Sequence, residues 1–177
     1  NETRALTIDA VEDALQNAYP AYEVRRAFTS QIVIEILEER DGHEIDNVIE
    51  AMDRLIADGV KEVVVQPTHV MAGFEYDDVV KEVSEYEGKF DSLKISNPIC
   101  VDDADYDALV KVLVEETATY NAEGTAVVFM GHGTHHEANA TYATLEAKLH
   151  EAGNTNYFIG TVEGSPLLDE VIASVQA

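Results

Sequence analysis

The chain has 177 residues, of which 46% are hydrophobic, and its 11 Lys and Arg against 35 Asp and Glu give a formal net charge of −24. This hydrophobic content is enough for a packed core and excludes an ordinary disordered tail. The charge argues against nucleic acid and against anionic membrane surfaces as partners, because both attract clusters of Lys and Arg. The simplest explanation of such acidity is solubility or adaptation to salt.

The spacing of apolar residues predicts helices and strands that alternate along the chain. In chain order, the first part should hold a helix over 3–18, a strand over 21–28, helices over 30–39 and 44–58, a strand over 61–65, a helix over 74–87 and a strand over 93–96. The second part should hold a helix over 106–117, a strand over 126–130, a helix over 137–151, a strand over 157–162 and a helix over 166–175, with Pro166 near its first turn. Three glycines, Gly59, Gly88 and Gly153, follow predicted helices and should end them.

This alternation predicts an α/β fold in which parallel sheets carry helices on both faces. Ligands of such folds bind beyond the carboxyl ends of the strands. The residues after each predicted strand are therefore the first candidates for function. They form four short segments, at 28–30, 66–69, 131–133 and 163–165.

The single cysteine, Cys100, excludes an intrachain disulfide and a cysteine-rich zinc site. No apolar run approaches the roughly 20 residues that a membrane-spanning helix needs. No secretion signal is visible at the start of the chain, although the chain begins at Asn1 rather than Met. A cytoplasmic location is therefore expected.

The densest chemical signal is the run Gly131-His132-Gly133-Thr134-His135-His136. A histidine between two glycines at a strand end has an exposed ring, and imidazole suits proton transfer or metal binding. The alternative is a turn whose histidine only completes a hydrogen bond. A phosphate loop is a poorer interpretation because its lysine and full glycine pattern are absent. His135 and His136 could extend a metal site, but we expect them to be solvated residues at a helix start.

Other polar residues also follow predicted strands. His69 comes after Gln66-Pro67-Thr68, where a lone histidine is more often structural, and Glu75 lies six residues further on. Glu163 follows an apolar strand and could simply cap the next helix. If its strand neighbours the strand before His132, the two side chains form a partial site for a borderline divalent metal.

Five segments together resemble the anaerobic cobaltochelatases, which are type II, ATP-independent tetrapyrrole chelatases. The matching segments are RAFTS at 26–30, RDG at 40–42, VVVQPTHVMAGFEY at 63–76, VVFMGHGTHH at 127–136 and GTVEGSP at 160–166. The resemblance implies two similar flavodoxin-type βα domains with parallel sheets. Residues 1–120 would form the N-terminal chelatase domain without its first strand, and residues 121–177 would begin an incomplete C-terminal domain.

The resemblance also implies roles for individual residues. His132 and Glu163 match metal ligands, and His132 with Glu75 would be catalytic. His69, Thr29 and Ser30 would face the bound tetrapyrrole. Two family features are absent from this sequence: the opening strand that ends in a small-residue turn, and a later strand that supplies another histidine. The chain is thus expected to hold two of three metal ligands.

The implied function is the insertion of Co²⁺ into a sirohydrochlorin-type tetrapyrrole in anaerobic cobalamin biosynthesis, without ATP. Fe²⁺ and Ni²⁺ remain open as alternative metals, because the ligand types do not separate them. Uncovered strand edges invite pairing with another chain, so a homo-oligomer is expected. Two other interpretations stay open: a non-catalytic α/β module that binds metal or haem, and a plain α/β domain whose histidines are structural. The charge of −24 should repel a polycarboxylate substrate, so its cleft must be locally neutral or basic.

Overall fold

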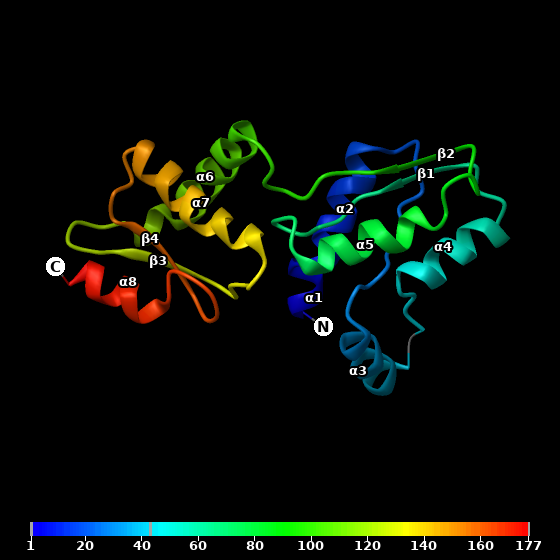
Figure 1. Cartoon of the computed structure of the whole chain (residues 1–177), viewed down its shortest axis with the longest axis horizontal. Helices are drawn as coiled ribbons and strands as arrows, with labels where there is room; N and C mark the ends of the chain where they lie inside the picture. Colours follow the sequence, from blue (N-terminus) through cyan, green and yellow to red (C-terminus); the bar gives the residue numbers. More distant parts are fainter. Residues whose placement is uncertain (1, 43, 177) are drawn as a thin grey trace. The chain divides into compact units, whose positions relative to one another are not determined.

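A computed structural model describes residues 2–42 and 44–176 as a mixture of helices and parallel strands (Figure 1). The chain divides into two compact units. The first unit comprises Asn1–Val63 and Glu82–Ser92, and the second comprises Val64–Lys81 and Leu93–Ala177. The α/β class predicted from the sequence is confirmed. The domain boundary near residue 120, which was implied by the family resemblance, stays a prediction.

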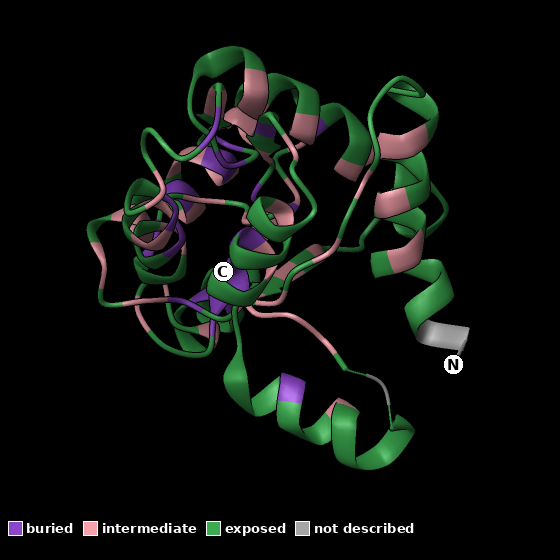
Figure 2. Cartoon of the chain, turned by 90° about the vertical axis from the view of Figure 1, so that its right-hand side faces the viewer, coloured by how far each residue is buried: buried purple, intermediate pink, exposed green. Residues whose placement is uncertain are grey.

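The first unit is mainly helical. Its helices are α1 (Glu2–Leu6), α2 (Ile8–Ala18), α3 (Gln31–Asp41) and α4 (Val48–Ala57). The single helix predicted over 3–18 is interrupted at Thr7, where the β-branched residue leaves the helical conformation (φ −123°, ψ −92°). Figure 2 shows α3 almost entirely exposed, and Ile34 is its one buried residue among those described.

Helix α4 begins later than the predicted 44–58, because Asn47 caps it. The Asn47 side-chain oxygen accepts the Glu50 N–H over 2.9 Å, and the Glu50 carboxylate accepts the Asn47 N–H over 2.9 Å. Gly59 follows the C-cap with φ +73°, a left-handed conformation that favours glycine. The predicted helix stop at Gly59 is confirmed.

The strand predicted over 21–28 is wrong. These residues are extended, and their exposure alternates from Glu23 to Phe28, but the only pairing among the described residues is an isolated bridge between Phe28 and Asn47. A strand needs a neighbour to accept its backbone hydrogen bonds, and alternation in the sequence predicts extension without supplying that neighbour. The segment is held by side chains instead: Arg25 pairs with Asp58, and Arg26 pairs with helix α2.

Strands β1 (Glu62–Val65) and β2 (Ser92–Ile95) form a two-stranded sheet, with helix α5 (Phe74–Ser84) between them in the sequence. The Ser92 N–H donates to Lys61 and the Ser96 N–H donates to Val65, so the two strands run in parallel. Helix α5 ends at Ser84, earlier than predicted, and a turn leads to Gly88 at φ +76°.

The second unit contains the larger sheet. Strand β3 (Val127–Gly131) pairs in parallel with β4 (Tyr157–Thr161), with Val127 opposite Tyr157 and Gly131 opposite Thr161. The helices of this unit are α6 (Asp103–Thr117), α7 (Ala140–Glu151) and α8 (Leu168–Val175), with short 3₁₀ turns η1 (Ala118–Tyr120) and η2 (Glu137–Asn139). Both strands and all three helices lie close to their predicted positions.

Helices cover both faces of the β3–β4 sheet (Figure 1). Tyr157 and Ile159 point toward α6 and α7, and they form the core of the unit with Val110, Leu145 and Leu149. Gly160 points the other way, and its missing side chain lets Leu168 and Val171 of α8 approach the strand. Helix α8 begins at Leu168, two residues later than predicted, and Pro166 lies just before its first turn.

Within the ranges 2–42 and 44–176, the structure shows no helix that is both long and apolar enough to cross a membrane.

Candidate functional site

His132 and Glu163 lie side by side beyond the carboxyl ends of β3 and β4. The parallel register continues past the strands: the Val162 N–H donates to Gly131 over 3.1 Å, and the Glu163 N–H donates to His132 over 2.7 Å. His132 Nε2 lies 3.8 Å from Glu163 Oε2, and the two side chains are 80% and 60% exposed. The predicted juxtaposition is therefore confirmed, and both groups are free to meet a ligand.

The glycines around His132 are required by their neighbours. A Cβ at Gly131 would overlap the ring of Tyr142, and a Cβ at Gly133 would overlap the backbone carbonyl of Glu163. Gly133 also has φ +84°, where other residues are strained. The turn is thus closed on one side by α7 and on the other by the chain after β4. His132 is the one residue of Gly131-His132-Gly133 that has space for a side chain, and that side chain projects outward.

Two residues that sequence analysis missed hold this turn. The Gly133 N–H donates to the Tyr142 hydroxyl over 3.2 Å. The Asn139 side-chain oxygen Oδ1 accepts the Thr134 N–H over 3.1 Å, and its side-chain Nδ2 donates to the Ser165 backbone carbonyl over 2.7 Å. Asn139 therefore links the turn after β3 to the turn after β4. No pattern in the sequence singles out an asparagine and a tyrosine in the segment that follows a histidine turn.

His135 and His136 differ in environment. His135 is exposed, as predicted. The prediction of a solvated His136 is wrong, because its side chain is only 17% exposed. Its Nδ1 accepts the Ala138 N–H over 3.0 Å and so caps the 3₁₀ turn η2. A local side-chain cap of this kind removes the ring from water.

His69 and Glu75 also belong to the second unit. The His69 carbonyl accepts the Ile99 N–H over 2.9 Å, and its ring lies edge-on to Tyr76. The His69 Nδ1 is buried and has no hydrogen-bond partner in the described part of the chain. Glu75 is exposed in the first turn of α5. No contact described for this unit joins either residue to His132 or Glu163 directly.

Thr29 and Ser30 belong to the first unit, just before α3. Thr29 is exposed, and the Ser30 hydroxyl accepts the Val33 N–H over 3.4 Å as the N-cap of α3. The structure thus gives Ser30 a local structural task. A tetrapyrrole-binding role for these two residues stays a prediction.

The His132–Glu163 pair brings together two side chains of types that can bind a metal. Across residues 2–42 and 44–176, no three His, Cys, Asp or Glu side chains converge in a way that would enclose a metal ion. Cys100 is buried, and this burial raises the pKa of its thiol, so it is a poor ligand and nucleophile at neutral pH. One imidazole and one carboxylate suit a borderline dication such as Co²⁺.

Comparison with known proteins identifies the family. The family described as "Cobalt chelatase (CbiK)" matches residues 1–177, the whole chain. The chain belongs to the cobalt chelatase family.

Two curated relatives carry names that agree with this membership. The sirohydrochlorin cobaltochelatase of Salmonella typhimurium is 34% identical over 176 residues, which is 99% of this chain and 66% of the relative. The sirohydrochlorin cobaltochelatase CbiKC of Nitratidesulfovibrio vulgaris is 28% identical over 172 residues, which is 96% of this chain and 60% of the relative. This cobalt chelatase chain thus spans slightly less than two thirds of the length of either relative. The predicted family membership is confirmed.

Proposed function

We propose that the protein inserts Co²⁺ into sirohydrochlorin, a step of anaerobic cobalamin biosynthesis. Membership of the cobalt chelatase family and the names of the two relatives support this reaction. The main structural support is the His132–Glu163 pair, whose Nε2 and Oε2 atoms lie 3.8 Å apart at adjacent strand ends. This pair is the reason for assigning the reaction to these two residues. Neither side chain is needed for packing, so both are available to the reaction.

The residue types fit the balance of the reaction. When Co²⁺ enters the macrocycle, two pyrrole N–H bonds break, two protons leave, and four nitrogens bind the metal. The neutral His132 imidazole holds the ion or accepts one of these protons. The Glu163 carboxylate offsets the loss of hydration of the dication and passes the second proton to water. No covalent bond forms between the protein and the macrocycle, so the proposed reaction uses no nucleophile, and it is written without ATP.

An exposed pair also suits a metal that is a substrate. A resident structural metal is usually enclosed by four protein ligands, whereas a metal in transit must arrive and leave. Because His132 and Glu163 are exposed, the other coordination positions of the metal are open to water or to the tetrapyrrole. Fe²⁺ and Ni²⁺ would fit the same ligands, and cellular supply would then decide among the metals.

The remaining candidate residues receive roles within the same proposal. Glu75, exposed at the start of α5, serves with His132 in proton transfer. His69, Thr29 and Ser30 bind the tetrapyrrole. The unpartnered Nδ1 of His69 supports its part, because a buried polar atom without a hydrogen bond is costly and a ligand could supply the partner. We further propose chelatase domains that meet near residue 120, a homo-oligomer, and a cytoplasmic location.

The test mixes the purified protein with sirohydrochlorin and Co²⁺ and follows the visible spectrum of the macrocycle. The proposal predicts the spectrum of cobalt-sirohydrochlorin at a rate above that of the protein-free mixture. A bound but unmetallated spectrum would indicate a binding module instead. An unchanged spectrum would contradict both and leave the chain as a plain α/β domain.

A further inference from the structure

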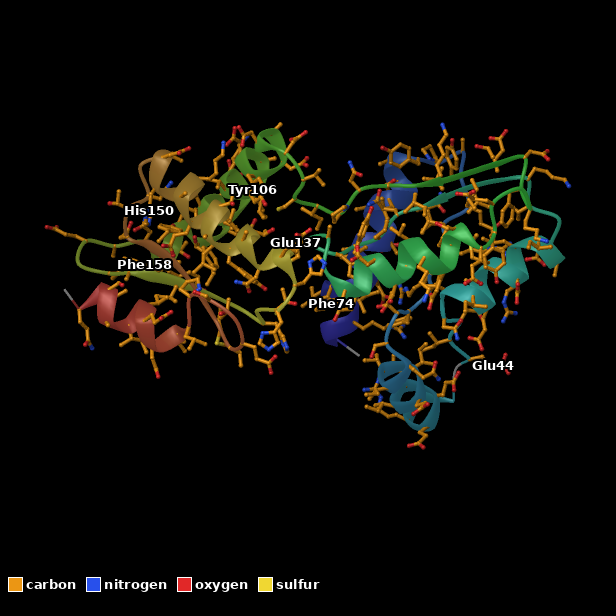
Figure 3. The ribbon with its side chains drawn as sticks, in the orientation of Figure 1. Glu44, Phe74, Tyr106, Glu137, His150 and Phe158 are labelled. Carbon is orange, nitrogen blue, oxygen red and sulfur yellow. The ribbon has the colours of Figure 1, made fainter. Side chains whose placement is uncertain are left out.

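His136 connects the turn that carries His132 to the start of helix α5. Its Nε2 lies 3.3 Å from the Asp77 carboxylate, and its ring meets the ring of Phe74 edge-on, with centroids 4.8 Å apart. Phe74 and Asp77 both lie in the first turn of α5. Figure 3 labels Phe74 on α5 and Glu137, the residue after His136, on the facing turn η2.

The hydrogen bonds of His136 fix the orientation of its ring. Nδ1 accepts the Ala138 N–H over 3.0 Å, so this nitrogen carries no proton. The proton of the neutral ring must then sit on Nε2, the nitrogen that faces Asp77. One nitrogen therefore caps η2 and the other meets a carboxylate of α5. His136 is only 17% exposed, so its ring nitrogens have little access to water.

Glu75 lies between the two α5 residues that His136 contacts. Phe74 and Asp77 flank it in the same helical turn, and His132 lies four residues before His136 in the turn after β3. A contact between His136 and this helical turn therefore limits how far Glu75 can move from His132. The Asp77 side chain is 58% exposed, so the pair contributes little to stability, and its effect is on position.

We propose that the Asp77–His136 contact is a positioning device, which holds the first turn of α5, with Glu75, against the turn that carries His132. The proposal rests on the proposed chelatase function. Asp77 and His136 touch neither metal nor macrocycle in this scheme. They set the geometry of the groups that do. Misplacement of a reacting group by about 1 Å can cost as much as 100-fold in rate, so a weak contact can matter greatly for turnover.

Four single variants and one double variant test the proposal. Asp77→Ala removes the carboxylate, and Asp77→Asn keeps an oxygen that can accept from Nε2. His136→Asn keeps an oxygen near the position of Nδ1, so it caps η2 but does not reach Asp77. Asp78→Ala is the matched control, because Asp78 is the exposed neighbour on the same helix with the same charge. Cobalt insertion gives kcat and KM for each variant and for Asp77→Ala/His136→Asn.

We expect Asp77→Ala and His136→Asn each to lower kcat about tenfold, with the KM for Co²⁺ unchanged because His132 and Glu163 remain. The double variant should be no slower than either single variant, since both remove the same contact. Asp77→Asn should recover most of the rate, and Asp78→Ala should match the parent. An unchanged kcat in Asp77→Ala, or effects that multiply in the double variant, would overturn the proposal.

A second measurement separates this proposal from the proposed function. Nitrogen NMR of the His136 ring should show a bare Nδ1 and a protonated Nε2, with the Nε2 signal shifted in Asp77→Ala and not in Asp78→Ala. A parent protein that shows this signature but inserts no cobalt would contradict the chelatase function and leave the contact intact. If the parent protein inserts cobalt but the His136 nitrogen signals are the same in the parent and in Asp77→Ala, only the positioning device is contradicted.

Discussion

Glu163 donates its backbone N–H to the carbonyl oxygen of His132 over 2.7 Å. The two candidate ligands are thus neighbours through the main chain as well as through their side chains. The parallel register of β3 and β4, in which Gly131 faces Thr161, sets the spacing of the two residues. A ligand pair set by a strand ladder loses little entropy when a metal binds, because the backbone is already ordered.

Substitution of Gly133 should disrupt this arrangement. In Gly133→Ala, the new Cβ would meet the Glu163 carbonyl, so we expect a loss of stability of about 3 kcal/mol or more from steric overlap and backbone strain. Gly153→Ala is the matched control, because Gly153 also has positive φ but faces open space. Gly153→Ala should lower the free energy of unfolding by about 1 kcal/mol. Urea unfolding measures both variants, and equal losses would show that the overlap is relieved without cost.

Asn139→Ala should separate the two turns beside the site. It removes the acceptor for the Thr134 N–H and the donor to the Ser165 carbonyl, so we expect a loss of about 1–3 kcal/mol. Asn139→Asp keeps the acceptor and loses the donor, and it should fall between Asn139→Ala and the parent. Thermal unfolding checks the order. If Asn139→Ala had the same melting temperature as the parent, water would be replacing both hydrogen bonds.

Glu163→Gln should weaken the binding of Co²⁺ while keeping the fold. The amide has the size of the carboxylate but no charge, and we expect the Kd for Co²⁺ to rise by about tenfold or more, since even outer partners of metal ligands contribute that much. Glu151→Gln, an exposed position on α7, changes the net charge equally and should leave the Kd unchanged. Isothermal titration with Co²⁺ compares the two, and equal affinities would exclude Glu163 as a ligand.

Tyr86 gives a pH-dependent test of the first unit. Burial, together with the hydrogen bond to Asp53, raises the pKa of Tyr86 to about 12, above the ordinary value of 10.0. The folded protein therefore holds this proton more tightly than the unfolded chain does. The resulting stability is present in full below pH 10 and is lost as the pH rises from 10 toward 12.

We expect Tyr86→Phe to be less stable than the parent by about 1 kcal/mol at pH 8, with the difference shrinking as the pH approaches 12. Tyr120→Phe is the control, because Tyr120 is 73% exposed. Urea unfolding across this pH range makes the measurement. If the stability difference between Tyr86→Phe and the parent grew with pH, the pKa of Tyr86 would not be raised by folding.

The sequence predicts the central parts of this fold because they have strong local signals. The apolar runs at 126–130 and 157–162 form strands β3 and β4, of which β4 is mostly buried and β3 alternates between half-buried and exposed residues. Their succession in one βαβ unit predicts that they are parallel neighbours. The placement of His132 beside Glu163 follows from that pairing. The strand over 21–28 fails because strand formation depends on a partner that lies elsewhere in the chain.

The support around the site is not predictable in the same way. Tyr142 and Asn139 act through contacts that only the folded chain brings together, with Gly131 and Gly133 in one case and with Ser165 in the other. The His136 ring contacts Phe74 and Asp77 of α5, which lie about 60 positions away in the sequence, so no local pattern indicates its partial burial. Sequence patterns thus locate the candidate site residues His132 and Glu163 better than the residues that hold them in place.

The most direct test of the chelatase account is the rate of cobalt insertion by His132→Ala, compared with His135→Ala. His132 is 80% exposed and packs against little, so its loss should leave circular dichroism and the melting temperature unchanged. We expect insertion to fall by about 100-fold or more, as for loss of a general base, whereas His135→Ala should retain the parent rate. Near-normal insertion by a folded His132→Ala protein would remove His132 from the mechanism and contradict the account.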